Sequence, residues 1–203
     1  MPDWAYIVIT VVLSVGVFAA MAMVLYRKNN PKEEKPQARS SGTGRAAGKM
    51  RSFARSNDFR FLGPATLESG GRTARLDALV IGYFGVLGLI SLGYNGEIYG
   101  SATDKQWLQV SPDKTREYFD NPVLEAAADV RVIRDALFAD KQKQVPVEVV
   151  CVFTDRRAQI AIPPKVGYLT MKSLGALLQK EKYLEDAGLD LDRVENAIRA
   201  AMV

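Results

Sequence analysis

The residues that could do chemistry in this 203-residue chain are mainly carboxylates, because it contains no histidine and one cysteine. The absence of histidine excludes a Ser-His-Asp or Cys-His nucleophile pair and a His-ligated zinc site. The single Cys151 forms no internal disulfide, which indicates a reducing compartment. Carboxylates that could bind a divalent cation such as Mg²⁺ surround one long uncharged stretch; they are Asp77, Glu68, Glu97 and Glu125.

The basic residues are distributed unevenly, and this affects how the net charge of +4 is interpreted. Residues 27–55 contain nine basic and two acidic residues, whereas residues 56–203 contain 18 basic and 20 acidic residues. A high overall pI would suggest nucleic-acid binding, but the excess charge lies in the short segment rather than in the larger part. In the larger part, the small groups Arg72/Arg75 and Arg156-Arg157 are the candidates for phosphate contacts.

Residues 4–26 form an uncharged apolar run that is long enough to cross a bilayer as a helix. Its aromatic residues, Trp4, Tyr6 and Tyr26, lie near the two ends, where interfacial rings are common. A cleaved signal peptide is the alternative, but no basic residue precedes the run and the run is long for a signal peptide. We therefore expect a retained single-pass anchor.

The basic segment that follows predicts the orientation of this anchor. The positive-inside rule places the amino terminus outside the cell membrane and everything after Tyr26 in the cytoplasm. Residues 27–52 combine Pro, Gly and Ser with dispersed charge, which predicts a flexible linker, and the basic residues of 27–55 are candidates for contacts with anionic lipid. The bilayer is thus an expected partner, while a protein partner stays unspecified.

A second uncharged stretch, residues 78–96, has two interpretations. Its hydropathy would fit another spanning helix. However, five glycines interrupt it and divide it into two strand-length apolar runs, Leu76–Ile81 and Val86–Leu92, around a Gly-Tyr-Phe-Gly turn. Apolar runs of this length are typical of strands that are buried on both faces, so we favour a strand pair.

The rest of the chain predicts a layered α/β domain over residues 53–203. Asn121-Pro122 is a typical helix start, and Thr170 and the Asp192/Glu195 pair are two more. The leucine at 184 is expected to share the apolar face of the helix that Thr170 caps. The predicted strands are Phe59–Glu68 with a kink, Glu97–Tyr99, Gln106–Val110, Val145–Thr154 and Gln159–Ile162.

Several short motifs in a fixed order resemble the nuclease-related domain (NERD), a bacterial and plant relative of the PD-(D/E)xK nucleases. They are Leu76-Asp77, Gly85-Val86, the segment Tyr94 to Gly100, Lys105-Gln106-Trp107, Phe119-Asp120-Asn121-Pro122 and Val150–Phe153. The resemblance implies a restriction-endonuclease-like domain with a central mixed sheet flanked by helices. It is also compatible with an amino-terminal anchor, since many relatives carry one.

The resemblance further implies where an active site would lie. In the family, an Asp on one strand and a Glu-x-Lys on the next hold a divalent metal and activate water. The Asp position is occupied by Asp77, but the Glu and Lys positions are Ile90 and Leu92, and a position that is often glutamine is Glu125. Asp77 is then more simply explained by an ion pair with Arg75 or by a local turn.

These departures lead to three hypotheses about function. The favoured one is a membrane-anchored, non-hydrolytic binding or scaffolding module without a cofactor. The second is a Mg²⁺-dependent nuclease whose ligands have moved to Glu68, Glu97 or Glu125 beside Asp77. The third is nucleic-acid binding without chemistry through Arg72 and Arg75.

Overall fold

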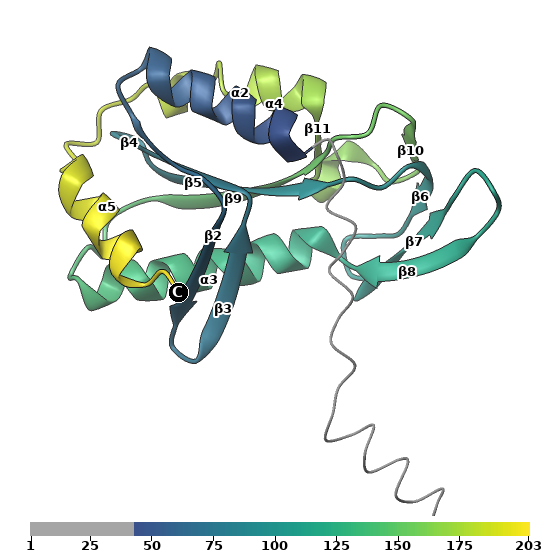
Figure 1. Cartoon of the computed structure of the whole chain (residues 1–203), viewed down its shortest axis with the longest axis horizontal. Helices are drawn as coiled ribbons and strands as arrows, with labels where there is room; N and C mark the ends of the chain where they lie inside the picture. The colour runs from purple at the N-terminus through teal and green to yellow at the C-terminus, as the bar shows by residue number, and fades with distance from the viewer. Residues whose placement is uncertain (1–42) are drawn as a thin grey trace, which may run out of the picture. The chain divides into compact units, whose positions relative to one another are not determined.

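The computed structural model describes residues 43–203, in which two layers of helices enclose a central mixed sheet (Figure 1). The sheet order is β1-β4-β5-β9-β11. The pairs β1-β4 and β4-β5 are antiparallel, and the pairs β5-β9 and β9-β11 are parallel. These strands span Arg60–Leu62, Ala78–Gly82, Gly85–Leu92, Val147–Phe153 and Leu169–Thr170. The mixed α/β architecture predicted from the sequence is confirmed.

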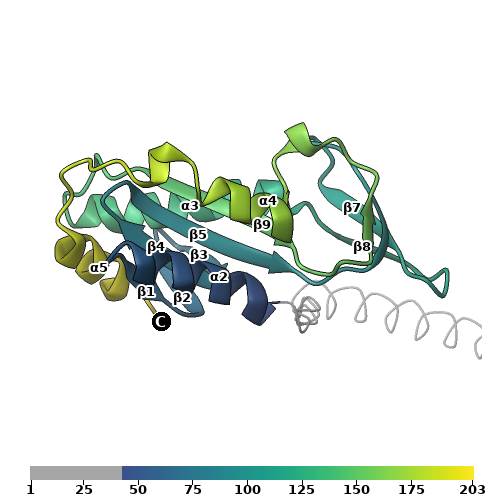
Figure 2. The same ribbon diagram turned by 90° about the horizontal axis from the view of Figure 1, so that it is seen from above.

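The helices cover both faces of this sheet, as Figures 1 and 2 show. Helices α2 (Thr43–Ser56) and α4 (Met171–Leu177) lie on one face, and α3 (Pro122–Ala139) and α5 (Leu191–Ala200) lie on the other. Each side has its own hydrophobic cluster, the one under α3 and α5 being the larger. Two short 3₁₀ turns, Pro164–Val166 and Glu181–Tyr183, complete the helical segments.

The uncharged stretch forms the strand pair favoured by its glycines. Every residue of β4 and β5 is buried, and the two strands pair from Ala78 opposite Leu89 to Gly82 opposite Gly85. Gly85 has a φ of +123°, and a Cβ there would lie 2.3 Å from the carbonyl oxygen of Pro146. Only glycine fits this turn, because a side chain would be both strained and in collision with the backbone.

No helix within residues 43–203 has the length and apolar character needed to cross a bilayer. The predicted anchor at residues 4–26, and the first part of the linker, lie outside the described residues. The linker prediction is wrong for residues 43–52, since they belong to α2. Ala46, Met50 and Ala54 recur at every fourth position and are buried against the sheet. Burial of this apolar surface offsets the conformational entropy that the segment loses when it forms a helix. The folded domain therefore begins about ten residues earlier than the predicted boundary at residue 53.

A second sheet and a hairpin extend from the central layers. The sheet β10-β6-β7-β8 consists of Ala158–Ile160, Gly96–Tyr99, Gln106–Val110 and Arg116–Asp120. Strand β8 was not predicted, because only Phe119 in it is buried and its alternation is weak. The predicted strand Phe59–Glu68 is in fact two strands: it divides at Gly63-Pro64 into β1 and β2 (Ala65–Ser69), and β2 pairs instead with β3 (Arg72–Leu76).

Helix caps explain where the chain turns from strand to helix. Asn121 and Thr170 cap their helices as predicted. Asn121 accepts a hydrogen bond from the Val123 N–H at 3.0 Å, and Thr170 forms a capping box with Ser173, which was not predicted. The predicted start at Asp192 is wrong, because the N-cap of α5 is Asp190, which accepts from two backbone N–H groups. Leu184 lies beyond α4 and is exposed rather than on its apolar face.

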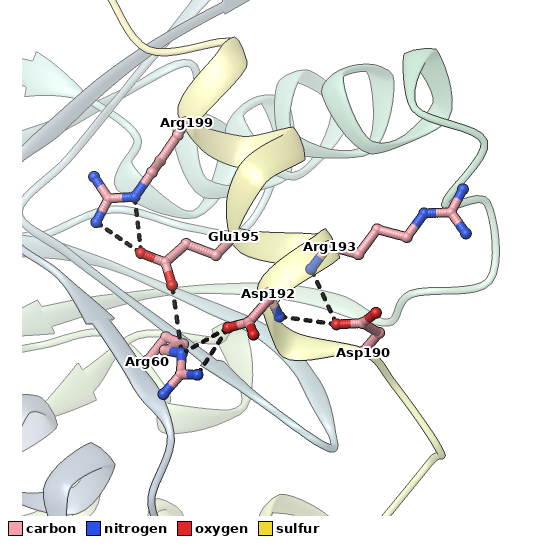
Figure 3. Close-up of polar contacts among 6 residues, drawn as sticks. All are labelled: Arg60, Asp190, Asp192, Arg193, Glu195 and Arg199. Atoms are coloured by element: carbon pink, nitrogen blue, oxygen red, sulfur yellow. Dashed lines mark hydrogen bonds and ion pairs between the residues drawn. The ribbon is translucent and has the colours of Figure 1, made fainter.

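Asp192 and Glu195 instead attach α5 to the edge of the central sheet (Figure 3). Arg60 of β1 donates to Asp192 at 2.7 Å and lies 3.5 Å from Glu195. Glu195 also accepts from Arg199 one turn later in the helix. These charges are therefore used to hold the last helix in place.

Candidate functional site

Asp77 lies at the break between β3 and β4, and its carboxylate points to the neighbouring strand. Its Oδ2 accepts the backbone N–H of Ser91 at 2.6 Å, while its own N–H donates to the carbonyl oxygen of Leu89 at 2.8 Å. The side chain is 3% exposed. Asp77 was expected to pair with Arg75 or to cap a local turn; in the structure its Oδ2 accepts a backbone N–H of β5, and Arg75 is exposed.

The strand register places this carboxylate beside the positions to which the sequence pattern assigns the catalytic pair. Ala78 pairs with Leu89, so Asp77 comes level with Ile90. Ile90 in turn pairs with Cys151 of β9, and Leu92 pairs with Phe153. The three strands therefore bring together the positions that the sequence comparison aligned.

The chemistry at these positions is nevertheless that of a hydrocarbon core. Ile90 and Leu92 are 7% and 3% exposed and belong to the hydrophobic cluster that also contains Cys151 and residues of α3. Ser91, between them, has a buried hydroxyl that finds no hydrogen-bond partner within residues 43–203. Helix α3 packs across β9 and covers this part of the sheet (Figure 1).

Glu125 is the candidate substitute whose charge acts on this region. Burial raises the pKa of the Cys151 thiol to about 12, and the Glu125 carboxylate adds to that shift. Burial also raises the pKa of Tyr94, and Glu125 contributes again. A raised pKa keeps the thiol protonated near neutral pH, so Cys151 is a packing residue rather than a nucleophile.

Asp129 lies one helical turn after Glu125 and was missed by the sequence reasoning. It is among the buried residues of α3 at 9% exposure. The signal that could have identified it is the four-residue spacing from Glu125, which places two carboxylates on one side of the helix.

The other two proposed substitutes lie in different elements and have their own contacts. Glu68 of β2 accepts from the Thr73 hydroxyl across the β2-β3 hairpin. Glu97 of β6 accepts from the hydroxyl of Tyr99, which holds the pKa of that phenol above its usual value. Both contacts are exposed.

The residues at the aligned positions do not fit a catalytic Mg²⁺. A magnesium ion requires oxygen ligands, and Ile90 and Leu92 present only carbon beside Asp77. Within residues 43–203, no group of three or more His, Cys, Asp or Glu side chains is placed to hold a metal ion. We therefore derive no catalytic step through a metal here.

Arg72 and Arg75, two of the arginines proposed for phosphate contacts, do not form a concentrated basic patch. Arg72 Nη1 lies 3.8 Å from Asp135 Oδ2 on α3, so its charge is partly balanced. Arg75 is exposed on the same strand, opposite Thr66. Two arginines on a hairpin, one of them in an ion pair, supply few contacts for the phosphate backbone of a nucleic acid.

A family model for the nuclease-related domain matches residues 40–154, which is more than half of the chain. The chain belongs to the nuclease-related domain (NERD) family. The match begins just before α2 and ends directly after β9, so it includes Asp77, Ile90, Leu92, Glu125 and Cys151. No curated protein and no solved structure matches the chain. The NERD resemblance predicted from the sequence is thus confirmed.

Proposed function

We propose that this NERD-family chain is a single-pass, membrane-anchored protein whose cytoplasmic domain does not hydrolyse nucleic acid and serves as a binding or scaffolding module. The observation that carries the proposal is the burial of Ile90 and Leu92 beside Asp77. Metal-assisted hydrolysis needs oxygen ligands and a group that orients water, and two aliphatic side chains supply neither.

The position of Asp77 also supports a structural role for this residue. Its carboxylate accepts a backbone N–H of β5 at 2.6 Å, at a point where β3 gives way to β4. A buried backbone N–H that lacks an acceptor destabilises the fold, so Asp77 contributes to stability without taking part in catalysis.

The membrane part of the proposal rests on the sequence alone. Residues 4–26 are uncharged and long enough to span a bilayer, and nine basic residues follow within 27–55. The proposed arrangement tethers the domain to the inner face of the cell membrane, with the basic segment available to anionic lipid.

A hydrolysis assay tests the loss of activity. The full chain in detergent is incubated with single- and double-stranded DNA and with RNA, in Mg²⁺ and in Mn²⁺, beside the Asp77→Asn variant. We expect both proteins to leave the substrates intact. Metal-dependent cleavage that Asp77→Asn abolishes would instead establish a nuclease with relocated ligands.

Alkaline extraction tests the anchor. We expect the full chain to stay with membranes after a carbonate wash, and a variant lacking residues 4–26 to be released. Release of both proteins by the wash would show that residues 4–26 do not anchor the chain.

A further inference from the structure

A cavity of about 480 Å³ opens at the other side of the central sheet, away from α3. Four basic side chains from separate segments line it: Arg45 and Lys49 of α2, Arg156 after β9, and Lys172 of α4. Arg45 and Lys49 are four residues apart, so both project from the same side of their helix. The cavity therefore concentrates positive charge in one small volume.

This charge has little acid to balance it. Within residues 43–203, none of the four side chains has a carboxylate within ion-pair distance. The single acid in the lining, Asp155, is bound by Arg157 at 2.8 Å. Hydrogen bonds from Arg157, with a smaller contribution from the charge of Arg45, lower the pKa of Asp155 to about 2. Residues 43–203 hold 22 basic against 20 acidic residues, so the concentration of positive charge does not follow from a strongly basic domain.

Two of the cations are held over the cavity by backbone carbonyls that also line it. Arg45 donates to the carbonyl oxygen of Thr154 at 3.5 Å, and Lys49 donates to that of Met171 at 3.3 Å. A Cβ at Gly175 would lie 2.7 Å from Nζ of Lys49. Glycine at this position therefore leaves room for the Lys49 ammonium against α4. Both side chains retain further donors that could bind an anion.

The place of the cavity in the fold also favours a ligand. Its lining residues come from the carboxyl ends of the parallel strands β9 and β11, from the segment after β9, and from α2 and α4. Ligands of open α/β sheets bind outside the carboxyl ends of parallel strands, because the loops there leave a crevice between elements. The remaining lining includes the apolar residues Ile160 and Met171.

We propose that this cavity binds a small molecule that carries a phosphate ester. Guanidinium and ammonium groups recognise phosphate oxygens, and the apolar lining offers a surface for an organic part such as a nucleobase. The volume lies within the range of small-molecule pockets. The proposal rests on the proposed function, since it gives the non-hydrolytic domain a ligand class.

Calorimetric titration of the full chain in detergent tests the proposal with three probes: adenosine monophosphate, glycerol 3-phosphate and inorganic phosphate. The first represents a nucleotide and the second an anionic lipid headgroup, so their order separates the two sources of phosphate ester. The pocket variant is Arg45→Gln/Arg156→Gln. The matched control is Arg72→Gln/Arg75→Gln, which removes the same charge from the β2-β3 hairpin.

We expect at least one of the two esters to bind the wild-type chain. Its affinity for the pocket variant should be at least about tenfold lower, and its affinity for the control variant should be unchanged. Lys172→Gln, an exposed single change, is expected to weaken binding in the same direction and guards against misfolding of the double variant. Binding of none of the probes, or equal loss in pocket and control variants, would overturn the proposal.

The same samples are assayed for hydrolysis, which keeps the two proposals separable. Ester binding together with metal-dependent hydrolysis would refute the non-hydrolytic function but support the proposal that the cavity binds a phosphate ester. No binding together with no hydrolysis would refute the pocket alone.

Discussion

The central sheet presents two contrasting regions: one has aliphatic side chains where the NERD resemblance predicts a Glu and a Lys, and the other brings four basic side chains together. Level with Asp77, the positions that the NERD pattern assigns to Glu and Lys are buried Ile90 and Leu92 under α3. At the ends of β9 and β11, four cations without ion pairs in the described part of the chain surround a cavity. The proposed ligand pocket therefore lies away from the positions that the NERD resemblance assigns to catalysis.

The two regions also differ in the free-energy cost of placing a charged side chain in them. An isolated charge in the first region would lose its hydration without gaining a partner, which is costly. In the second region the charged side chains are exposed, so their charges cost little and remain available to an anion. The substitutions below are designed to break or sharpen this contrast.

The largest effect is expected from putting a carboxylate back at the buried position. Ile90→Glu should lower the free energy of unfolding by about 3–5 kcal/mol, because the new charge is buried without a partner. Urea unfolding followed by the fluorescence of buried Trp107, in a Trp4→Phe background, measures the change.

Leu124→Glu is the control for that substitution. Leu124 is 44% exposed in the first turn of α3, so the same chemical change should alter the free energy by less than about 0.5 kcal/mol. An Ile90→Glu protein as stable as Leu124→Glu would mean that the region accommodates charge, contrary to our description.

The second effect concerns Cys151, the chain's single cysteine. Burial raises its pKa from 9.0 to about 12 and so favours the neutral thiol, which makes the reactive thiolate about a thousandfold rarer at pH 8. Alkylation by iodoacetamide, followed by mass spectrometry, should be slower by about that factor in buffer than in urea. Equal rates in the two solvents would show that the region is open to water.

A smaller effect is expected from removing the carboxylate that the first region does contain. Asp77→Ala should lower the free energy of unfolding by about 1–3 kcal/mol, since the buried N–H of Ser91 loses its acceptor. Asp77→Asn keeps an acceptor oxygen and should cost less. If both variants matched the wild type in urea unfolding, the structural role of Asp77 would be refuted.

The smallest effect on stability is expected in the second region. Arg45→Gln/Arg156→Gln should change the free energy of unfolding by less than about 0.5 kcal/mol at physiological salt, with any change stabilising, because mutual repulsion of the cations is reduced. Urea unfolding at low and at high salt measures this, and the difference should vanish at high salt. A large loss of stability would mean that these arginines hold the fold together.

Local patterns predicted the elements that have local causes. Gly82 and Gly85 interrupt an apolar stretch, and Asn121-Pro122 combines a cap with a preset backbone, so β4, β5 and α3 were all predicted. Helix α2 was missed over residues 43–52 because dispersed charges obscured the four-residue spacing of its buried residues Ala46 and Met50. Strand β8 was missed because a largely exposed strand has little apolar alternation.

The candidate sites depend on long-range pairing, which the sequence does not display. Aligning Asp77 with Ile90 and Cys151 requires the register of three strands. The cavity combines side chains near residues 45, 156 and 172, which come together only when α2 and α4 pack on the same face of the sheet. No local spacing marks such a set.

The binding of Mn²⁺ tests most directly whether the family's catalytic positions are closed to metal. The electron paramagnetic resonance signal of free Mn²⁺ is recorded during titration into the full chain and into Asp77→Asn. We predict that the two proteins reduce the signal equally, because Ile90 and Leu92 give the ion no ligands beside Asp77. One equivalent of Mn²⁺ bound by the wild type and lost in Asp77→Asn would contradict the account.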